Sequence, residues 1–301
     1  MRLGVDIGGT KTDVVLVHAG AIVARHTTLS GFGADEVLAS ASGAVAAVLG
    51  DAGTTWAQVE SVGIGVPGGV SEGVVTYALN LGLERLDLAS ALRDAWGVRP
   101  VIDNDVNVAA LGAWGLRTRP TGSLAYLNLG TGLAAGIILD GRLWRGARGT
   151  AGEIGHIAVD PAGPLDADGL PGALETYASG SGLTRQWAVD GAVARDVLEA
   201  ADRDDPRAVA IRDGLYFGVA SAVRALVLTL DVDTIVLGGG LSAHGEALVE
   251  GTRRVLDDWS SRSSFLGSLE MTERLELLDS DVPVAALGAA ELGANPGGID
   301  G

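Results

Sequence analysis

The sequence predicts an α/β protein built from two similar halves. A short apolar strand, a Gly/Thr turn and two further strands occur first in LGVDIGGTKTDVVLVHAGAIVARHTT and again in SLAYLNLGTGLAAGIILDGRLWRG. After each copy, helical and strand patterns alternate, which is typical of α/β proteins. With 301 residues, the chain is long enough for one large domain or two of medium size.

The first half is predicted to begin with three strands, because β-rich runs at 2–7, 12–18 and 21–27 are separated by turn residues. Further elements follow from apolar periodicity and from helix start and stop signals. They are a helix at about 34–50, a strand in ESVGIGVPGG, a helix over 87–96 between Asp87 and Gly97, a strand in VRPVIDND and a helix opening at DVNVAALGAW.

The second half repeats the strand pattern from residue 123 and then becomes helical at about 205–230. A strand, a Gly triplet and a helix follow in DVDTIVLGGGLSAHGEALVEG, and VPVAALGAAELGA is the last predicted helix. The turn residues of GLRTRPTG place the boundary near 115–121. We therefore expect a small domain at 1–117 and a large one at 118–301.

Composition excludes several classes of function. The net charge of −17 argues against general binding to nucleic acid or to an anionic membrane, because both need a basic surface. The chain has no cysteine, hence no disulfide, thiolate metal site or cysteine nucleophile. The N-terminal MRLGVDIGGT lacks the apolar run of a signal peptide, and no apolar stretch approaches the roughly 18 residues of a membrane span. We expect a cytoplasmic protein.

Two Gly/Thr turns at strand ends are candidate phosphate sites. Glycines let the backbone approach an anion, and threonine adds a hydroxyl donor. In DIGGTK, Asp6 precedes the turn and is placed to face a metal ion or its water shell. LGTG at 129–132 repeats the turn without the acid, and GGG at 238–240 follows a third strand. The alternative is that these are plain hairpin turns.

A candidate general base lies where a strand meets a helix, in VIDNDVNVAALG. A carboxylate there can accept a hydroxyl proton, as in phosphoryl-transfer enzymes. For Asp103, Asn104 and Asp105 the alternative role is helix N-cap. Asn107, in the first turn, suits support of the loop.

The stretch GTAGEIGHIA places Glu153 and His156 three positions apart among small residues. The acid and the histidine are the most reactive groups of a stretch otherwise suited to close packing, which makes them candidate site residues. The alternative is a buried structural Glu–His pair.

Seven motifs in order resemble the ROK family of sugar kinases and repressors, over nearly the whole chain. DIGGTKT is similar to its first phosphate motif, VPG with Asn80-Leu81 to its early sugar loop, and DNDVNVAALG to its catalytic motif. LGTG resembles its second phosphate motif, and GTAGEIGH with ETYASG its signature. TIVLGGGLS and LGAA at 287–290 complete the series.

The resemblance implies the two-domain actin/hexokinase-like (ribonuclease H-like) ATPase fold, with a duplicated β-meander and an interdomain cleft. It implies that the last helix, about 284–294, packs back on the N-terminal domain. ATP and Mg²⁺ would be the cofactors, a sugar the substrate, and a homodimer the assembly.

The resemblance also implies roles for single residues. Asp105 would be the catalytic base, and Asp6 would act indirectly through Mg²⁺. The residues implied to bind sugar are Asn104, Glu153, His156, Glu175, Gly68 and Asn80. Those implied to line the nucleotide site are Asp6, Gly8, Gly9, Thr10, Lys11, Thr131, Gly132, Gly239 and Gly240.

The chain departs from the family where most members read GHxxVxxxGxxCxCGxxGCxE and hold a structural zinc. Here Asp166, Asp168 and Ala173 stand at the cysteine positions. Structural zinc favours four nitrogen or sulfur ligands, so we expect none in this loop. Packing, prolines and hydrogen bonds must then hold it. A second departure is Gly69, where many members have proline.

The leading hypothesis is ATP-dependent phosphorylation of glucose at its 6-hydroxyl, in carbohydrate metabolism and glycolysis. Alternatives are a kinase for N-acetylmannosamine, N-acetylglucosamine, mannose, allose or fructose, or a non-catalytic sugar-responsive regulator. Family repressors carry an added N-terminal DNA-binding domain, and the first motif here begins within six residues of the start. Polyphosphate remains open as an alternative donor.

Overall fold

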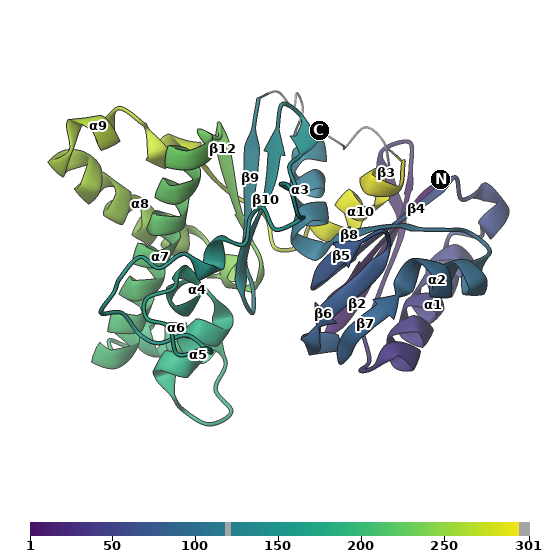
Figure 1. Cartoon of the computed structure of the whole chain (residues 1–301), viewed down its shortest axis with the longest axis horizontal. Helices are drawn as coiled ribbons and strands as arrows, with labels where there is room; N and C mark the ends of the chain where they lie inside the picture. Colours follow the sequence, from purple (N-terminus) through teal and green to yellow (C-terminus); the bar gives the residue numbers. More distant parts are fainter. Residues whose placement is uncertain (118–121, 295–301) are drawn as a thin grey trace. The chain divides into compact units, whose positions relative to one another are not determined.

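The computed structural model describes residues 1–117 and 122–294 (Figure 1). The same strand order occurs twice in it. One five-stranded sheet has the order β3-β2-β1-β4-β8 and the other β11-β10-β9-β12-β13. The first contains β1 (Arg2–Ile7), β2 (Lys11–His18), β3 (Ala21–Leu29), β4 (Ser61–Val66) and β8 (Val101–Asn104). The second contains β9 (Leu124–Leu129), β10 (Leu133–Leu139), β11 (Arg142–Leu143), β12 (Thr234–Gly238) and β13 (Leu275–Leu277).

In the first sheet, β1 pairs antiparallel with β2 and parallel with β4, which in turn pairs parallel with β8. In the second, β12 pairs parallel with both β9 and β13. The repeated order confirms the predicted duplication. A third, antiparallel sheet, which the sequence did not predict, contains β5 (Gly69–Ser71), β6 (Val74–Ala78) and β7 (Leu83–Asp87).

The chain divides into two units. Unit 1 comprises Met1–Thr121, Gly136–Ala151 and Pro283–Gly301, and unit 2 comprises Gly122–Ala135 and Gly152–Val282. The predicted boundary at 117/118 adjoins residues 118–121, which lie outside the described residues. The segments 136–151 and 283 onward group with unit 1 although both follow that boundary in the sequence.

In unit 1, helices cover both faces of the sheet. Alternate residues of β2 point to opposite sides: Val14 and Leu16 belong to the core that includes α1 (Ala34–Asp51), whereas Val15 and Val17 pack with α10 (Val284–Ala294). α2 (Leu88–Trp96) begins after Asp87, whose carboxylate accepts the Ser90 N–H, and ends at left-handed Gly97, as predicted.

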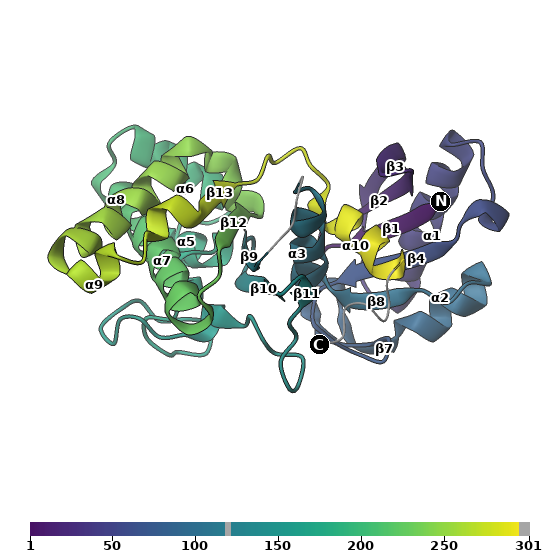
Figure 2. The same cartoon turned by 90° about the horizontal axis from the view of Figure 1, so that it is seen from above.

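α10 approaches its neighbours closely because glycines form the contact. It packs against α3 (Asp105–Gly115), β1 and β4, and it lies beside α3 in Figure 2. A Cβ atom on Gly288 would collide with the carbonyl of Val108, and one on Gly63 with that of Ala289. The small residues of LGAA therefore allow close backbone contact of α10 with both α3 and the sheet.

Unit 2 adds a helical layer to its sheet. Its helices are α4 (Leu174–Tyr177), α5 (Gly180–Trp187), α6 (Ala194–Asp202), α7 (Pro206–Leu230), α8 (Glu246–Arg262) and α9 (Ser264–Gly267). Short 3-10 helices in the chain are η1 (Trp56–Gln58), η2 (Leu79–Leu81), η3 (Ile154–His156), η4 (Gly240–His244) and η5 (Met271–Arg274). The sequence predicted α7 and α8, and missed α4, α5, α6 and α9.

The expectation that no apolar stretch approaches a membrane span was wrong for α7. With 25 residues, this helix is long and apolar enough to cross a membrane when judged by length and composition alone. Within its most apolar stretch, 56 % is buried inside the protein, as in the core helix of a globular unit.

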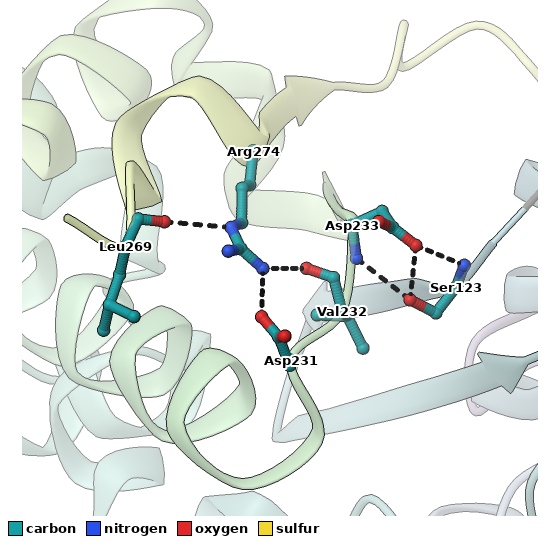
Figure 3. A network of polar contacts seen from close by, with 6 residues as sticks. All are labelled: Ser123, Asp231, Val232, Asp233, Leu269 and Arg274. Carbon is teal, nitrogen blue, oxygen red and sulfur yellow. Dashed lines mark hydrogen bonds and ion pairs between the residues drawn. The ribbon is translucent and has the colours of Figure 1, made fainter.

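A polar network fixes the starts of β9 and β12 and the approach to β13 (Figure 3). The Asp233 carboxylate accepts the N–H and the hydroxyl of Ser123, both at 2.7 Å, and these bonds lower the pKa of Asp233. The Arg274 guanidinium donates to Asp231 Oδ1 and to the Val232 carbonyl, each at 2.8 Å. Parallel strands aligned at their starts bring their carboxyl ends together, where the turns at 130–132 and 239–240 lie.

Candidate active site

The first Gly/Thr turn, residues 8–11, is tied to the start of the segment after β3. The Gly8 N–H donates to the Lys11 carbonyl at 3.0 Å, which closes the turn. The hydroxyl of buried Ser30 donates to the Gly8 carbonyl at 2.6 Å, and the Ser30 N–H donates to the Thr10 carbonyl at 3.1 Å. Thr12 shares a hydrogen bond of 3.0 Å with the Ser30 hydroxyl. Ser30, which the sequence analysis missed, thus fixes the turn.

The outer part of this turn is exposed and lies against Asn80. A Cβ atom on Gly9 would stand 3.0 Å from the Asn80 Cβ, so the turn approaches this predicted sugar-loop residue closely. Gly9, Thr10 and Lys11 are exposed to solvent. Lys11 is the only lysine among the 21 Lys and Arg residues of the chain.

Asp6 and Asp105 are electrostatic neighbours although 99 residues separate them in the sequence. Asp6 lies in β1 opposite Gly65 of β4. A Cβ atom on Gly65 would lie 3.6 Å from Asp6 Oδ1 and 3.5 Å from the Asp105 Cα, so this glycine makes room for both acids. Burial, followed by the charges of Asp105 and Asp13, raises the pKa of Asp6 to about 8, and Lys11 acts in the opposite direction.

Asn104 is the N-cap of α3, the alternative considered for this motif. Its side-chain oxygen accepts the N–H groups of Val106 at 2.9 Å and Asn107 at 3.4 Å. Its side-chain nitrogen donates to the carbonyl of Gly68 at 3.1 Å. Gly68 has φ 89°, and a Cβ atom there would crowd the β6 backbone. Asn104 therefore connects the predicted sugar loop to the start of α3.

Asp103 is committed to an internal ion pair. It is 6 % exposed and accepts Arg145 Nε at 2.8 Å and a terminal nitrogen of the same guanidinium at 2.6 Å. Its other oxygen accepts the Asn107 side chain at 2.9 Å, which supports the predicted loop role of Asn107. Arg145 was missed, because nothing near WRG in the sequence signals a partner 42 residues away.

In unit 2, Glu153 immediately precedes η3 and His156 is its last residue, and both side chains are exposed. The alternative of a buried Glu–His pair was therefore wrong. The neighbouring glycines fix the loop, because Cβ atoms on Gly152 and Gly155 would strike the carbonyls of Ala135 and Leu133. The Ala135 N–H also donates to the Gly152 carbonyl at 2.8 Å.

Glu175 in α4 joins this loop to the second Gly/Thr turn. Its carboxylate accepts the N–H of Leu133 at 3.0 Å, and a Cβ atom on Gly132 would lie 2.7 Å from the same oxygen. Gly155 packs closely against Glu175, because a Cβ atom added to this glycine would stand 3.3 Å from the Glu175 Cβ.

At the expected cysteine positions, Asp166 accepts the N–H groups of Asp168 at 2.9 Å and Leu170 at 2.8 Å, and so stabilises a turn. Within residues 1–117 and 122–294, no cluster of three His, Asp or Glu side chains is arranged to hold a metal ion.

The second turn docks onto the start of α5. The N–H groups of Gly180 and Ser181 donate to the carbonyls of Gly130 and Thr131 at 2.8 and 3.1 Å. Beside this junction is a cavity of about 720 Å³, large enough for a small organic ligand. It is lined by the predicted residues Thr131 and Gly240, and also by Ser181, Thr184 and residues of α6.

The cavity has apolar walls and one half-buried histidine. Leu198 and Leu241 line it, and His244 Nε2 lies 3.1 Å from the Tyr216 hydroxyl. Burial lowers the pKa of His244. Gly239 has φ 84° and passes so close to the β9 end that a Cβ atom would lie 2.6 Å from Asn128 Oδ1.

The predicted site residues thus fall into two sets, one in each unit. Unit 1 contains Asp6, Gly8, Gly9, Thr10, Lys11, Gly68, Asn80, Asn104 and Asp105, and unit 2 contains Thr131, Gly132, Glu153, His156, Glu175, Gly239 and Gly240. Supporting residues that the sequence analysis missed are Ser30, Arg145 and Ser181.

The sequence profile of the ROK family matches residues 2–291, and the chain belongs to this family. The glucokinase of Halalkalibacterium halodurans is 32 % identical over 272 residues, covering 82 % of each chain. An N-acetylmannosamine kinase of Vibrio cholerae is 32 % identical over 246 residues, covering 79 % of this chain and 83 % of that protein.

Among solved structures, the ROK family glucokinase from Streptomyces griseus, in complex with glucose and AMPPNP, has a TM-score of 0.78 and 29 % identity. The match covers 98 % of this chain and 99 % of that one. The comparison confirms the predicted fold class.

Proposed function

We propose that this chain is an ATP-dependent sugar kinase that phosphorylates glucose at its 6-hydroxyl. The observation that carries the proposal is that the acids Asp6 and Asp105 lie near each other, beside an exposed Gly/Thr turn. The chain also belongs to the ROK family. A base must stand next to the transferring phosphate, and this arrangement supplies one.

Asp105 is the residue proposed to accept the hydroxyl proton as the sugar oxygen attacks the terminal phosphorus of ATP, whose bond to the bridging oxygen breaks to release ADP. It occupies the first turn of α3, while Asn104 caps the helix and Asp103 pairs with Arg145. The two preceding residues, the amide Asn104 and the acid Asp103, therefore have structural tasks, and their contacts hold the start of α3, where Asp105 lies. The backbone N–H groups of the turn at 8–11 and the ammonium of Lys11 offset phosphate charge.

The residues fit Mg²⁺, because carboxylate oxygens are its usual protein ligands. Asp6 faces the charges of two other acids, and a cation would relieve this repulsion. Mg²⁺, held indirectly through Asp6 and directly by the phosphates, would supply charge neutralisation when bound.

A nucleotide donor is supported by the cavity of unit 2. Its lining is mostly apolar, which suits a nucleoside, and its charged members are Arg195, Glu199 and Asp202. The donor site proposed here therefore comprises Thr131, Gly132, Gly239 and Gly240 with the cavity beside them.

Glucose is the leading sugar because several relatives are glucokinases, including the Halalkalibacterium halodurans protein. The Vibrio cholerae relative supports N-acetylmannosamine as the second candidate. Asn80, Gly68, Glu153, His156 and Glu175 are the proposed hydroxyl-binding set. We also propose a cytoplasmic homodimer that binds neither nucleic acid nor membrane.

The test is mass spectrometry of a sugar panel incubated with ATP and Mg²⁺, with and without a zinc chelator. We expect glucose 6-phosphate, unaffected by the chelator. Asp105→Asn should lower kcat by at least about 10³-fold while nucleotide affinity stays within about threefold, since a general base is lost. Absence of any sugar phosphate from the wild type would refute the proposed function. Full activity of Asp105→Asn would remove this residue from the role of base.

A further inference from the structure

The segment between His156 and Glu175, residues 157–174, forms a loop whose two ends are paired. We call it the 157–174 loop. Its two ends are joined by backbone hydrogen bonds, from the Leu174 N–H to the Ile157 carbonyl at 2.9 Å and from the Val159 N–H to the Gly172 carbonyl at 2.8 Å. The predicted sugar-binding residues His156 and Glu175 therefore stand directly before and after the paired ends of the loop. Its tip is exposed, with Leu165 at 57 % and Leu170 at 63 %.

One side-chain hydrogen bond anchors this loop to the helical body. The Tyr177 hydroxyl donates to Asp160 Oδ2 at 2.9 Å, and Asp160 Oδ1 accepts the Ala162 N–H, also at 2.9 Å. Among the described residues, this is the only side-chain hydrogen bond from the loop to the rest of unit 2. Gly163 and Gly172 lie at the same point, because Cβ atoms there would strike the Tyr177 hydroxyl and the Asp160 carbonyl.

Tyr177 is a rigid partner for the loop. Its side chain is buried, and its ring meets the Phe217 ring edge-on with centroids 5.5 Å apart. A Cβ atom on Gly218 of α7 would lie 2.6 Å from the Tyr177 Cβ, so the helix backbone holds the tyrosine closely. Burial and the adjacent Asp160 raise the pKa of Tyr177 to about 12, which keeps the phenol protonated as a donor.

We propose that Tyr177 and Asp160 are positioning residues that set the place of His156 relative to Glu175 without a metal ion. Tyr177 lies two residues after Glu175 in α4, and Asp160 lies four residues after His156. Their hydrogen bond joins the two chain segments that carry these groups. The inference rests on the proposed function, because it assumes that the two groups bind the sugar.

The experiment compares Tyr177→Phe with the wild type. Loss of one hydrogen bond to a charged group should raise the sugar KM about 5- to 10-fold, with kcat and the nucleotide KM changed less than twofold. Amide hydrogen exchange in residues 158–172 should accelerate, while exchange in α7 stays as in the wild type.

Two matched variants sharpen the comparison. Asp160→Asn keeps an oxygen for the Ala162 N–H and an NH₂ group that can donate to the Tyr177 oxygen, so it should restore most sugar affinity relative to Asp160→Ala. Tyr216→Phe makes the same chemical change on the cavity side, where the hydroxyl bonds His244. It should leave the sugar KM within twofold and act, if at all, on the nucleotide KM.

The outcomes separate the two proposals. A wild type that phosphorylates no sugar refutes the proposed function, and hydrogen exchange then still tests whether Tyr177 anchors the loop. A Tyr177→Phe variant with lowered Tm but unchanged sugar KM overturns the positioning role. Unchanged exchange in 158–172 overturns the anchor itself.

Discussion

Arg145→Met tests whether the ion pair with Asp103 holds the start of α3 in place. Methionine keeps an apolar stem of similar length while removing the guanidinium. The change leaves the Asp103 carboxylate, only 8 % exposed, without its cationic partner. Because Asp103 also binds Asn107, the consequence should reach Asp105 in the same helical turn.

The expected magnitude follows from the contacts. Removing one partner of a fully buried ion pair costs about 3–5 kcal/mol. Here the Arg145 side chain is 29 % exposed, and Asp103 keeps hydrogen bonds from the Asn107 side chain and the Asn104 N–H at 2.9 and 2.7 Å. We therefore expect a cost below this range, about 2–3 kcal/mol of unfolding free energy.

The assay is urea unfolding together with steady-state kinetics. Arg148→Met is the matched control, because Arg148 lies three residues away and is exposed, and it should cost less than about 0.5 kcal/mol. Arg145→Met should also lower kcat about 10-fold through displacement of Asp105. Adding Asp103→Asn should cost less than the sum of the single changes. Equal stability of the Arg145 and Arg148 variants would refute the reasoning.

Three further outcomes are expected. Without metal, Asp6→Asn should gain stability over the wild type as pH rises from about 4 to about 8. The raised pKa of Asp6 makes the folded wild type hold a proton that the unfolded chain releases, so the wild type loses stability over this interval. An equal difference in unfolding free energy between variant and wild type at pH 5 and pH 8, measured by urea unfolding, would contradict this. Gly288→Ala should destabilise the fold by about 3 kcal/mol or more, because the new methyl group collides with the Val108 carbonyl. Gly43→Ala, which has open space around it in α1, should instead stabilise the fold by about 0.5–1 kcal/mol. Urea unfolding measures both changes. Lys11→Met should weaken nucleotide binding about 10-fold or more in calorimetry, and Lys11→Arg should restore part of the loss by keeping the charge, so equal binding by both variants and the wild type would exclude a phosphate contact.

Much of the fold was predictable because its signals are local. The turn residues, the Asp87 cap and the apolar periods of α1 and α7 act over a few neighbouring positions. The third sheet was missed because β5 to β7 are only three to five residues long, with Gly68 and Gly69 obscuring the first of them.

The candidate site was predictable by residue type and not by role. DNDV offered three acceptors in a row, and local pattern left each as either cap or base. Packing separates them: Asn104 caps α3 and Asp103 pairs with Arg145. This division depends on where β11 brings Arg145, which no short pattern encodes.

The sequence by itself determined the family, the duplicated strand order and the glycine turns, because these depend on residue types at fixed short spacings. Only the tertiary structure decided that Asp6 stands near Asp105 and that Tyr177 anchors Asp160. The Asp6–Asp105 approach depends on strand register and on the space left by Gly65, and the Tyr177 anchor depends on the packing of α4 against α7. The physical reason is that contacts between distant segments are set by the packing of whole elements.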